Sequence, residues 1–274
     1  MSLLVSLWGP KIAEKQRDRG HLNCLLVACS KGHLDVVQYL LSIGNDSNKA
    51  DNRGWTGLHA ASYKGHVNIC KALIANKADI NCVDKDGGSA VLLAAQEGHI
   101  EVFHLLQTHG ARIDIVDNSG SNALHLACQS GHLEMVKMLA SMPIFSSNLT
   151  SPDNAGLCSL GVSMSYGHLE VVKYLLSLGM DPRRKDNSGA TTFFHACLSG
   201  QQKIVEYFMS PPENEKDRDK EMQIPYLNEL LHRSRLDGIS PVDIARMNGH
   251  RELFVVLSTY MQSTKYSTPL LIEE

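Results

Sequence analysis

The chain has 274 residues, 43% of them hydrophobic and 20% charged, and its formal net charge is -3 at pH 7. This apolar content is enough for a sizeable core, and the negative charge argues against nucleic-acid binding, which depends on lysine and arginine neutralising phosphates. No apolar run approaches the roughly 18 residues that span a bilayer, so we expect no membrane insertion.

The cysteines and the first residues of the chain indicate a reducing compartment. The seven cysteines are an odd number without Cys-x-x-Cys spacing, which favours neither a disulfide framework nor a zinc site. Residues 1–20 are apolar and then basic, and they lack the positive start and the full-length apolar core of a signal peptide. We expect a cytoplasmic protein, with the nucleus as an alternative, and interpret residues 1–20 as an N-terminal extension or cap.

A recurring Gly-His pair sets the period of the chain. Its first spacings are 33 residues, and Gly200-Gln201 occupies the same slot without the histidine. In most units an Asp-x-x-Gly sequence ends 11 residues before the glycine of the pair. Asp-x-x-Gly favours a turn, because aspartate bonds nearby amides and glycine accepts a positive φ. A fixed period of this kind indicates a stack of similar units. The pairs begin at Gly32, Gly65, Gly98, Gly131, Gly167 and Gly249.

Each unit is predicted to contain a short helix, a glycine break and a longer helix. A small polar residue two positions after the turn glycine is a suitable N-cap for the short helix. After the Gly-His pair, apolar residues at offsets +2, +4, +5 and +8 form one face of the longer helix, as residues 169–175 illustrate. The predicted N-caps are Thr56, Ser89, Asn122, Thr191 and Ser240.

The sequences "DNRGWTGLHAASYKGHVNICKALI" (51–74) and "DNSGSNALHLACQSGHLEMVKML" (117–139) resemble the ankyrin repeat. The resemblance covers about residues 21–258, or seven repeats. It implies an all-α fold, an ankyrin-repeat solenoid of stacked helix-turn-helix units with β-hairpin-like fingers. The expected repeats are 21–50, 51–83, 84–116, 117–152, 153–185, 186–236 and 237–258, followed by a C-terminal tail, 259–274.

The first departure from the period is "SMPIFSSNLTSP" (141–152), which adds three residues and two prolines. The helix that follows has Gly161 in its interior, where glycine costs about 0.5–1 kcal/mol relative to alanine. We therefore predict a weak interface that splits the array into residues 21–140 and 153–258.

The second departure is a charged insertion, 210–236. Its segment "ENEKDRDKE" has no apolar residue and is expected to be solvated. Tyr226, Leu227, Leu230 and Leu231 then lie on one face of a predicted short helix. This helix either packs back on the array or forms an additional contact with a partner.

The evenly spaced histidines could suggest a ladder of metal ligands, but the geometry of a stack argues against it. Equivalent residues of neighbouring repeats lie about 10 Å apart, too far to share one ion. In the ankyrin family these histidines tie helices to loops and to the next repeat. Motifs such as G-x-S-x-G and H-E-x-x-H are absent from the sequence. We expect no enzyme activity, no cofactor and no metal.

The resemblance implies a protein partner, of unknown identity, bound at the finger tips and the concave face. Trp55 is the favoured hot spot, with packing onto the neighbouring finger as the alternative; Trp55→Ala is expected to abolish binding without changing the thermal midpoint. The protein is interpreted as a monomeric interaction scaffold, or alternatively as an adaptor that recruits targets to a modifying complex. The candidate contact residues are Arg53, Trp55, Tyr63, Lys64, Lys85, Asp86, Gln96, Glu97, Asn118, Ser119, Ser121, Gln129, Ser165, Tyr166, Asn187 and Ser188.

Overall fold

The computed structural model describes residues 24–210, 227, 230–231 and 236–265. Within these ranges the named elements are all α-helices, which confirms the expected fold class. The chain divides into two compact units, residues 1–127 and 128–274, and each is described by itself. The proposed cap, residues 1–20, lies outside the described residues.

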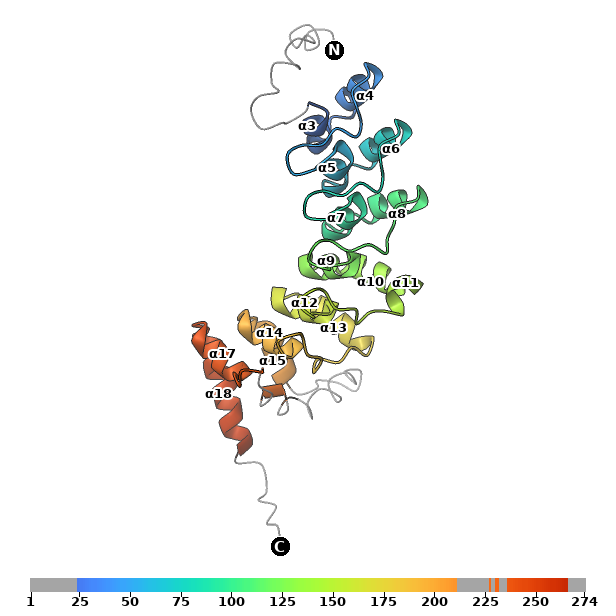
Figure 1. Ribbon diagram of the computed structural model, residues 1–274. Helices are drawn as coiled ribbons and strands as arrows, with labels where there is room; N and C mark the ends of the chain where they lie inside the picture. The colour runs from blue at the N-terminus through green and yellow to red at the C-terminus, as the bar shows by residue number, and fades with distance from the viewer. Residues whose placement is uncertain (1–23, 211–226, 228–229, 232–235, 266–274) are drawn as a thin grey trace. The chain divides into compact units, whose positions relative to one another are not determined.

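The first unit consists of helix pairs in two rows (Figure 1). The first helices of its repeats, α3, α5 and α7, pack in sequence, and the second helices, α4, α6 and α8, do the same. Their bounds are α3 (Cys24–Lys31), α4 (Leu34–Ser42), α5 (Gly57–Tyr63), α6 (Val67–Ala75), α7 (Ala90–Gln96) and α8 (Ile100–Thr108).

The second unit also consists of paired helices, and the division between the two units falls within α9 (Ala123–Ser130). Helix α14 packs between α12 and α17, and α15 contacts α13 and α18. The bounds are α10 (Leu133–Ser141), α11 (Pro143–Ser146), α12 (Ser159–Tyr166), α13 (Leu169–Ser177), α14 (Thr192–Leu198), α15 (Gln202–Met209), α17 (Pro241–Met247) and α18 (Arg251–Lys265).

The core is a repeated set of apolar positions between the two rows of helices. The fourth residue after each Gly-His glycine is buried at Ile69, Val102 and Val171, which are at most 2% exposed. Val36, at the same position of the first described repeat, is 41% exposed. Because each repeat covers its neighbour, this end of the stack presents core positions that the described residues leave uncovered.

The turn aspartates organise the fingers as the sequence predicts. Oδ1 of Asp51 accepts hydrogen bonds from the amides of Arg53 and Trp55, at 2.8 and 2.9 Å. In each of the next four repeats, Oδ1 of the turn aspartate likewise accepts hydrogen bonds from the amides two and four residues later in the chain. Neighbouring fingers are joined through their backbones, for example from the Lys85 amide to the Arg53 carbonyl. The fingers are therefore ordered parts of the stack.

The predicted N-caps of the short helices are confirmed. Hydroxyls of Ser89, Thr191 and Ser240 accept hydrogen bonds from amides in the first turn of their helices. Asn122 does the same through Oδ1, from the amides of Leu124 and His125. Thr56 forms a reciprocal capping box with His59.

The junction at residues 141–152 forms α11, and Phe145 is buried at 4% exposure. The two compact units divide after Ala127, and the weak interface at residues 141–152 stays a prediction. Gly161 does lie inside α12, but a Cβ there would be 2.9 Å from Leu157 and 3.3 Å from Thr192. The glycine therefore allows α12 and α14 to pack closely, a role that its helix propensity did not predict.

The charged insertion and the tail are described only in part. Residues 211–226, including Tyr226, lie outside the described residues, whereas Leu227, Leu230 and Leu231 are helical and at most 1% exposed. Their burial favours a helix that packs on the array. Helix α18 continues to Lys265, beyond the expected end of the last repeat at residue 258.

Candidate functional site

The Gly-His pair is an inter-repeat connection. In the second unit, Nε2 of His168 donates to the carbonyl of Gln129 at 2.8 Å, and His250 donates to the carbonyl of Leu198 at 3.0 Å. In each case the histidine ring lies against the glycine of the preceding repeat, Gly131 or Gly200. The glycine provides the space, and the histidine of the next repeat fills it.

The sixth repeat keeps this connection without a histidine. The side-chain amide of Gln201 donates to the carbonyl of Ser165 at 2.9 Å and lies against Gly167. Glutamine therefore replaces the hydrogen bond of histidine, and the gap in the histidine column is a substitution that preserves the contact.

We expect Gln201→Ala to lower the free energy of unfolding by about 1 kcal/mol, because the Ser165 carbonyl loses its donor. Gln201→His should change it by less, since histidine makes this bond in the neighbouring repeats. Urea denaturation of the three proteins checks this. Equal loss in both variants would show that the amide has a role other than this bond.

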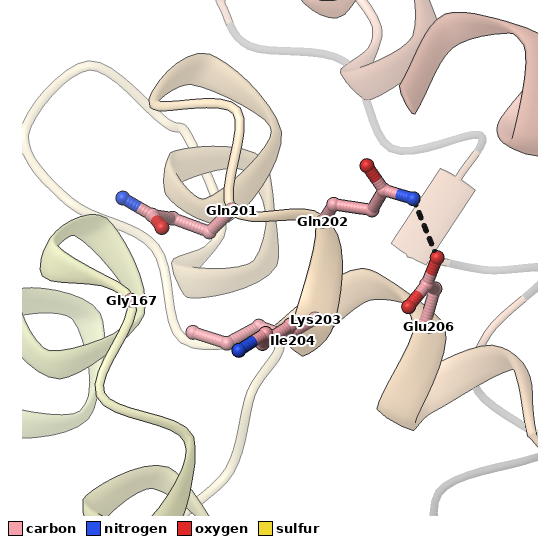
Figure 2. A pocket seen from close by; sticks show the side chains of 6 residues that line it. All are labelled: Gly167, Gln201, Gln202, Lys203, Ile204 and Glu206. Atoms are coloured by element: carbon pink, nitrogen blue, oxygen red, sulfur yellow. Dashed lines mark hydrogen bonds between the residues drawn. The ribbon is translucent and has the colours of Figure 1, made fainter. Parts of the chain in front are cut away.

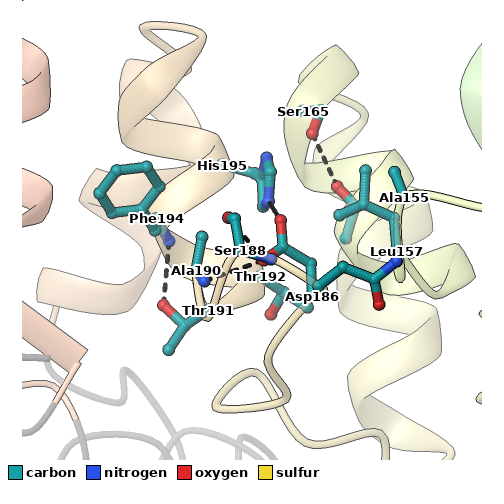
Figure 3. Close-up of polar contacts among 12 residues, drawn as sticks. Ala155, Leu157, Ser165, Asp186, Ser188, Ala190, Thr191, Thr192, Phe194 and His195 are labelled. Carbon is teal, nitrogen blue, oxygen red and sulfur yellow. Dashed lines mark hydrogen bonds and ion pairs between the residues drawn. The ribbon is translucent and has the colours of Figure 1, made fainter. Parts of the chain in front are cut away.

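His59 and His195 hold structural positions of two different kinds. His59 is buried, with Nδ1 3.1 Å from the amide of Thr56 and Nε2 3.1 Å from the carbonyl of Gly88. His195 forms a contact with Asp186 (Figure 3), 2.8 Å from Nε2 to Oδ2, and both side chains are largely buried. Burial alone would raise the pKa of Asp186, but hydrogen bonds from Ser188, His195 and the Ala190 amide lower it. This pair fixes the sixth finger against its own helix.

The described part of the chain does not gather metal-binding groups. Within residues 24–210 and 236–265, no cluster of three histidine, cysteine or acidic side chains could hold an ion. The cysteines are free thiols. Burial raises the pKa of the Cys70 thiol to about 11, so this group behaves as an apolar side chain rather than a nucleophile.

The hollow shown in Figure 2 lies at the start of α15. It has a volume of 560 Å³, opens widely to solvent, and is lined by Gly167, Gln201, Gln202, Lys203, Ile204 and Glu206. Gln202 donates to Glu206 at 2.6 Å, and the Gln201 amide is engaged by Ser165. Three of its polar side chains are thus engaged within the protein, and the hollow has no arrangement that indicates catalysis.

The structure brings together four of the predicted contact residues in the second repeat. The Arg53 guanidinium carbon lies 4.7 Å from the Trp55 ring centre, Trp55 and Tyr63 are 5.5 Å apart, and Nζ of Lys64 lies 4.9 Å from the Tyr63 ring. We call Arg53, Trp55, Tyr63 and Lys64 the cation–aromatic patch. Both cationic residues are exposed, and the two rings are half-buried.

Trp55 has a structural role in this patch. Its indole Nε1 donates to Oδ2 of Asp84 in the next finger at 2.8 Å. Trp55 therefore packs onto the neighbouring finger, as the alternative interpretation of this residue expected. We now expect Trp55→Ala to lower stability, against the earlier expectation of an unchanged midpoint, so this substitution does not separate binding from folding.

Several predicted contact residues are engaged in finger structure. The side-chain amides of Asn118 and Asn187 donate to carbonyls of the preceding finger, Lys85 and Asn154. Hydroxyls of Ser119 and Ser188 donate to their own turn aspartates. Ser121, a candidate contact residue, is only 8% exposed, because a side chain this small is enclosed by the finger.

The remaining predicted residues lie at the surface. Lys85 and Asp86 are exposed at the third finger, and Gln96 and Glu97 are half-buried at the end of α7. The Glu97 carboxylate raises the pKa of the Tyr63 hydroxyl. In the second unit, Tyr166 is 54% exposed. Gln129 donates to its hydroxyl at 2.9 Å, and the neighbouring Ser165 hydroxyl donates to the Gly161 carbonyl.

Sequence reasoning missed two residues of this surface. Lys31, exposed in the last turn of α3, occupies the position of Lys64 one repeat earlier. Its place directly before Gly32 was a sufficient signal. Asp84 was interpreted only as a turn residue, and its bond to Trp55 could not be found without the distance between fingers.

Comparison with known proteins agrees with this architecture. A family model described as "Ankyrin repeats (3 copies)" matches residues 3–84, 68–153 and 142–221. Among solved structures, the chain is similar to the crystal structure of the human ASB11 ankyrin repeat domain, with a TM-score of 0.65 and 22% identity. The match covers 86% of this chain and 98% of that one. At this identity the likeness shows the fold alone.

Among the helices in the described part of the chain, none is both long and apolar enough to cross a bilayer.

Proposed function

Because the chain belongs to the ankyrin repeat family, a family of protein-interaction modules, we propose that it is a non-enzymatic scaffold. It binds a protein partner through its finger tips and the ends of its first helices. We further propose that it acts as a monomer in the cytoplasm or nucleus, where its free cysteines stay reduced.

One observation carries this proposal: stacking and surface positions are separate in the sequence of each repeat. Gly131, Gly167 and Gly200 lie against a side chain of the next repeat. The turn aspartates, such as Asp51 and Asp186, accept hydrogen bonds within their own fingers. The residue pair before each Gly-His glycine is more exposed and changes from Tyr63-Lys64 to Gln96-Glu97 and Ser165-Tyr166. Conserving the frame while the surface varies is how one fold can be adapted to one partner.

The proposal is tested with two tyrosines of similar exposure. Tyr166 is 54% exposed at the end of a first helix, and Tyr39 is 48% exposed on the second helix α4. We expect Tyr166→Ala to reduce capture of partner proteins on the immobilised chain by about tenfold, as for a hot spot. Tyr39→Ala should leave capture unchanged. Quantitative mass spectrometry of the captured proteins measures both.

The opposite pattern, with Tyr39→Ala losing partners and Tyr166→Ala keeping them, would place the binding surface on the second helices. Circular dichroism of both variants serves as the folding control, because both side chains are half exposed and neither is part of the core.

A further inference from the structure

We propose that the cation–aromatic patch, together with Lys31 and Lys85, binds an acidic segment of the partner protein. This inference rests on the proposed function and names the chemistry of the ligand at one part of the binding surface. The segment would place carboxylates against the cations and an apolar side chain against the exposed parts of Trp55 and Tyr63.

Two carboxylates of this region, Asp51 and Asp84, are turned inward and are already engaged. The Asp51 side chain is 8% exposed, and its oxygens accept bonds from the amides of Arg53 and Trp55 and from the Arg53 side chain. Asp84, buried at 9% exposure, accepts from the amides of Asp86 and Gly88 and from the Trp55 indole. An approaching partner therefore does not meet these two negative charges directly.

The cations of the same region are turned outward. The Arg53 side chain is 66% exposed although it bonds Asp51, and Lys64 is exposed beside the Tyr63 ring. Lys31 is exposed on α3, which packs against α5. Lys85 is exposed in the third finger, and its backbone amide donates to the Arg53 carbonyl. With Asp51 and Asp84 buried and these cations exposed, the surface around them has a positive potential that attracts acidic groups.

The aromatic rings complete the site. Arg53 and Lys64 lie over Trp55 and Tyr63, and such contacts hold flexible cations in defined positions. The indole is also fixed by its bond to Asp84. A pre-organised surface loses less conformational entropy when a ligand binds.

The charge of the surface changes sign in the next repeat, which fixes where the acidic residues bind. Glu97 occupies the position of Lys64 one repeat later, close enough to raise the pKa of the Tyr63 hydroxyl. Asp86 is exposed at the tip of the third finger. We therefore place the carboxylates of the segment against Lys31 and Lys64, and not against α7.

The test uses the full chain and two fluorescein-labelled peptides, one of glutamate and leucine and the other with every glutamate replaced by lysine. Fluorescence anisotropy measures their dissociation constants at low and raised ionic strength. We expect the acidic peptide to bind at least about tenfold more tightly, with an affinity that falls as salt screens the charges. Equal affinities for the two peptides would overturn the proposal.

Two charge reversals in the same unit locate the site. Lys64→Glu should weaken the acidic peptide by about tenfold, because an attraction is replaced by a repulsion. Lys71→Glu, at an exposed position of α6, makes the same change in net charge and should alter it by less than about twofold. Lys64→Gln, which removes the charge only, should give an intermediate loss. An equal loss in the Lys64→Glu and Lys71→Glu proteins would show non-specific attraction and overturn the proposal.

Two other occupants are outcomes of the same test. If poly(U) RNA binds more tightly than the acidic peptide and is lost in Lys64→Glu, the patch binds nucleic acid. If sedimentation shows self-association that Lys64→Glu abolishes, the occupant is a second copy of the chain. Either result contradicts the acidic-segment proposal. Capture that depends on Tyr166 but is not competed by the acidic peptide would reject this inference and leave the proposed function intact.

Discussion

Replacing Gly131 by alanine is expected to lower the free energy of unfolding by about 2–4 kcal/mol, of which about 1–2 kcal/mol is backbone strain. Gly131 has a φ of +77°, which L residues rarely adopt. A Cβ there would lie 2.6 Å from Cε1 and 2.7 Å from Cγ of His168. The ring cannot move away without losing its bond to the Gln129 carbonyl. Strain and a steric clash therefore add together.

Gly179 in the same unit provides the matched control. Its φ is +83°, and an added Cβ would meet no atom within 4 Å. Gly179→Ala should therefore cost only the strain, about 1–2 kcal/mol. Guanidinium denaturation of both variants measures the difference. If the two substitutions were equally destabilising, the Gly-His contact would not be a tight one, and the glycine would be needed only for its backbone conformation.

The frame of the fold could be predicted from the sequence because it depends on local chemistry that repeats. Asp-x-x-Gly forms a turn wherever it occurs, and a small polar residue such as Ser89 or Thr191 can cap a helix without help from a distant segment. The 33-residue period then multiplies each local signal, so that one unit predicts the others. This is why helix positions, N-caps and finger turns agree with the structure.

The binding surface was predicted less well because side-chain partners across repeats depend on distances that a period does not contain. The position after the finger glycine is half-buried at Trp55 and buried at Ser121, although both were candidate contact residues. Asn118 and Asn187 have the polar character of contact residues, yet their amides bond the preceding finger. The local sequence pattern identified the variable positions. It could not predict which of their side chains form hydrogen bonds to a neighbouring repeat and which remain free to contact a partner.

We expect His59→Ala to lower the free energy of unfolding by about 2–4 kcal/mol at pH 7.5, because it combines a cavity with lost hydrogen bonds. His59 has no exposed surface. Nε2 donates to the Gly88 carbonyl, so Nδ1 carries no proton and accepts from the Thr56 amide. The substitution leaves the Gly88 carbonyl and the Thr56 amide without this partner. His104→Ala, at an exposed position of α8, should change stability by less than about 0.5 kcal/mol.

The same geometry makes the contribution of His59 dependent on pH. Burial lowers the pKa of His59, despite the opposing charge of Asp84, and protonation of Nδ1 would remove the acceptor for Thr56. In the unfolded chain the pKa is about 6.5. The unfolded state therefore binds more protons, and the stabilisation is complete above about pH 6.5 and falls as the pH drops toward the lower folded value. The stability difference between wild type and His59→Ala should shrink between pH 7.5 and 5.5. A difference that stays constant over this range would show that the histidine is not held in its neutral form.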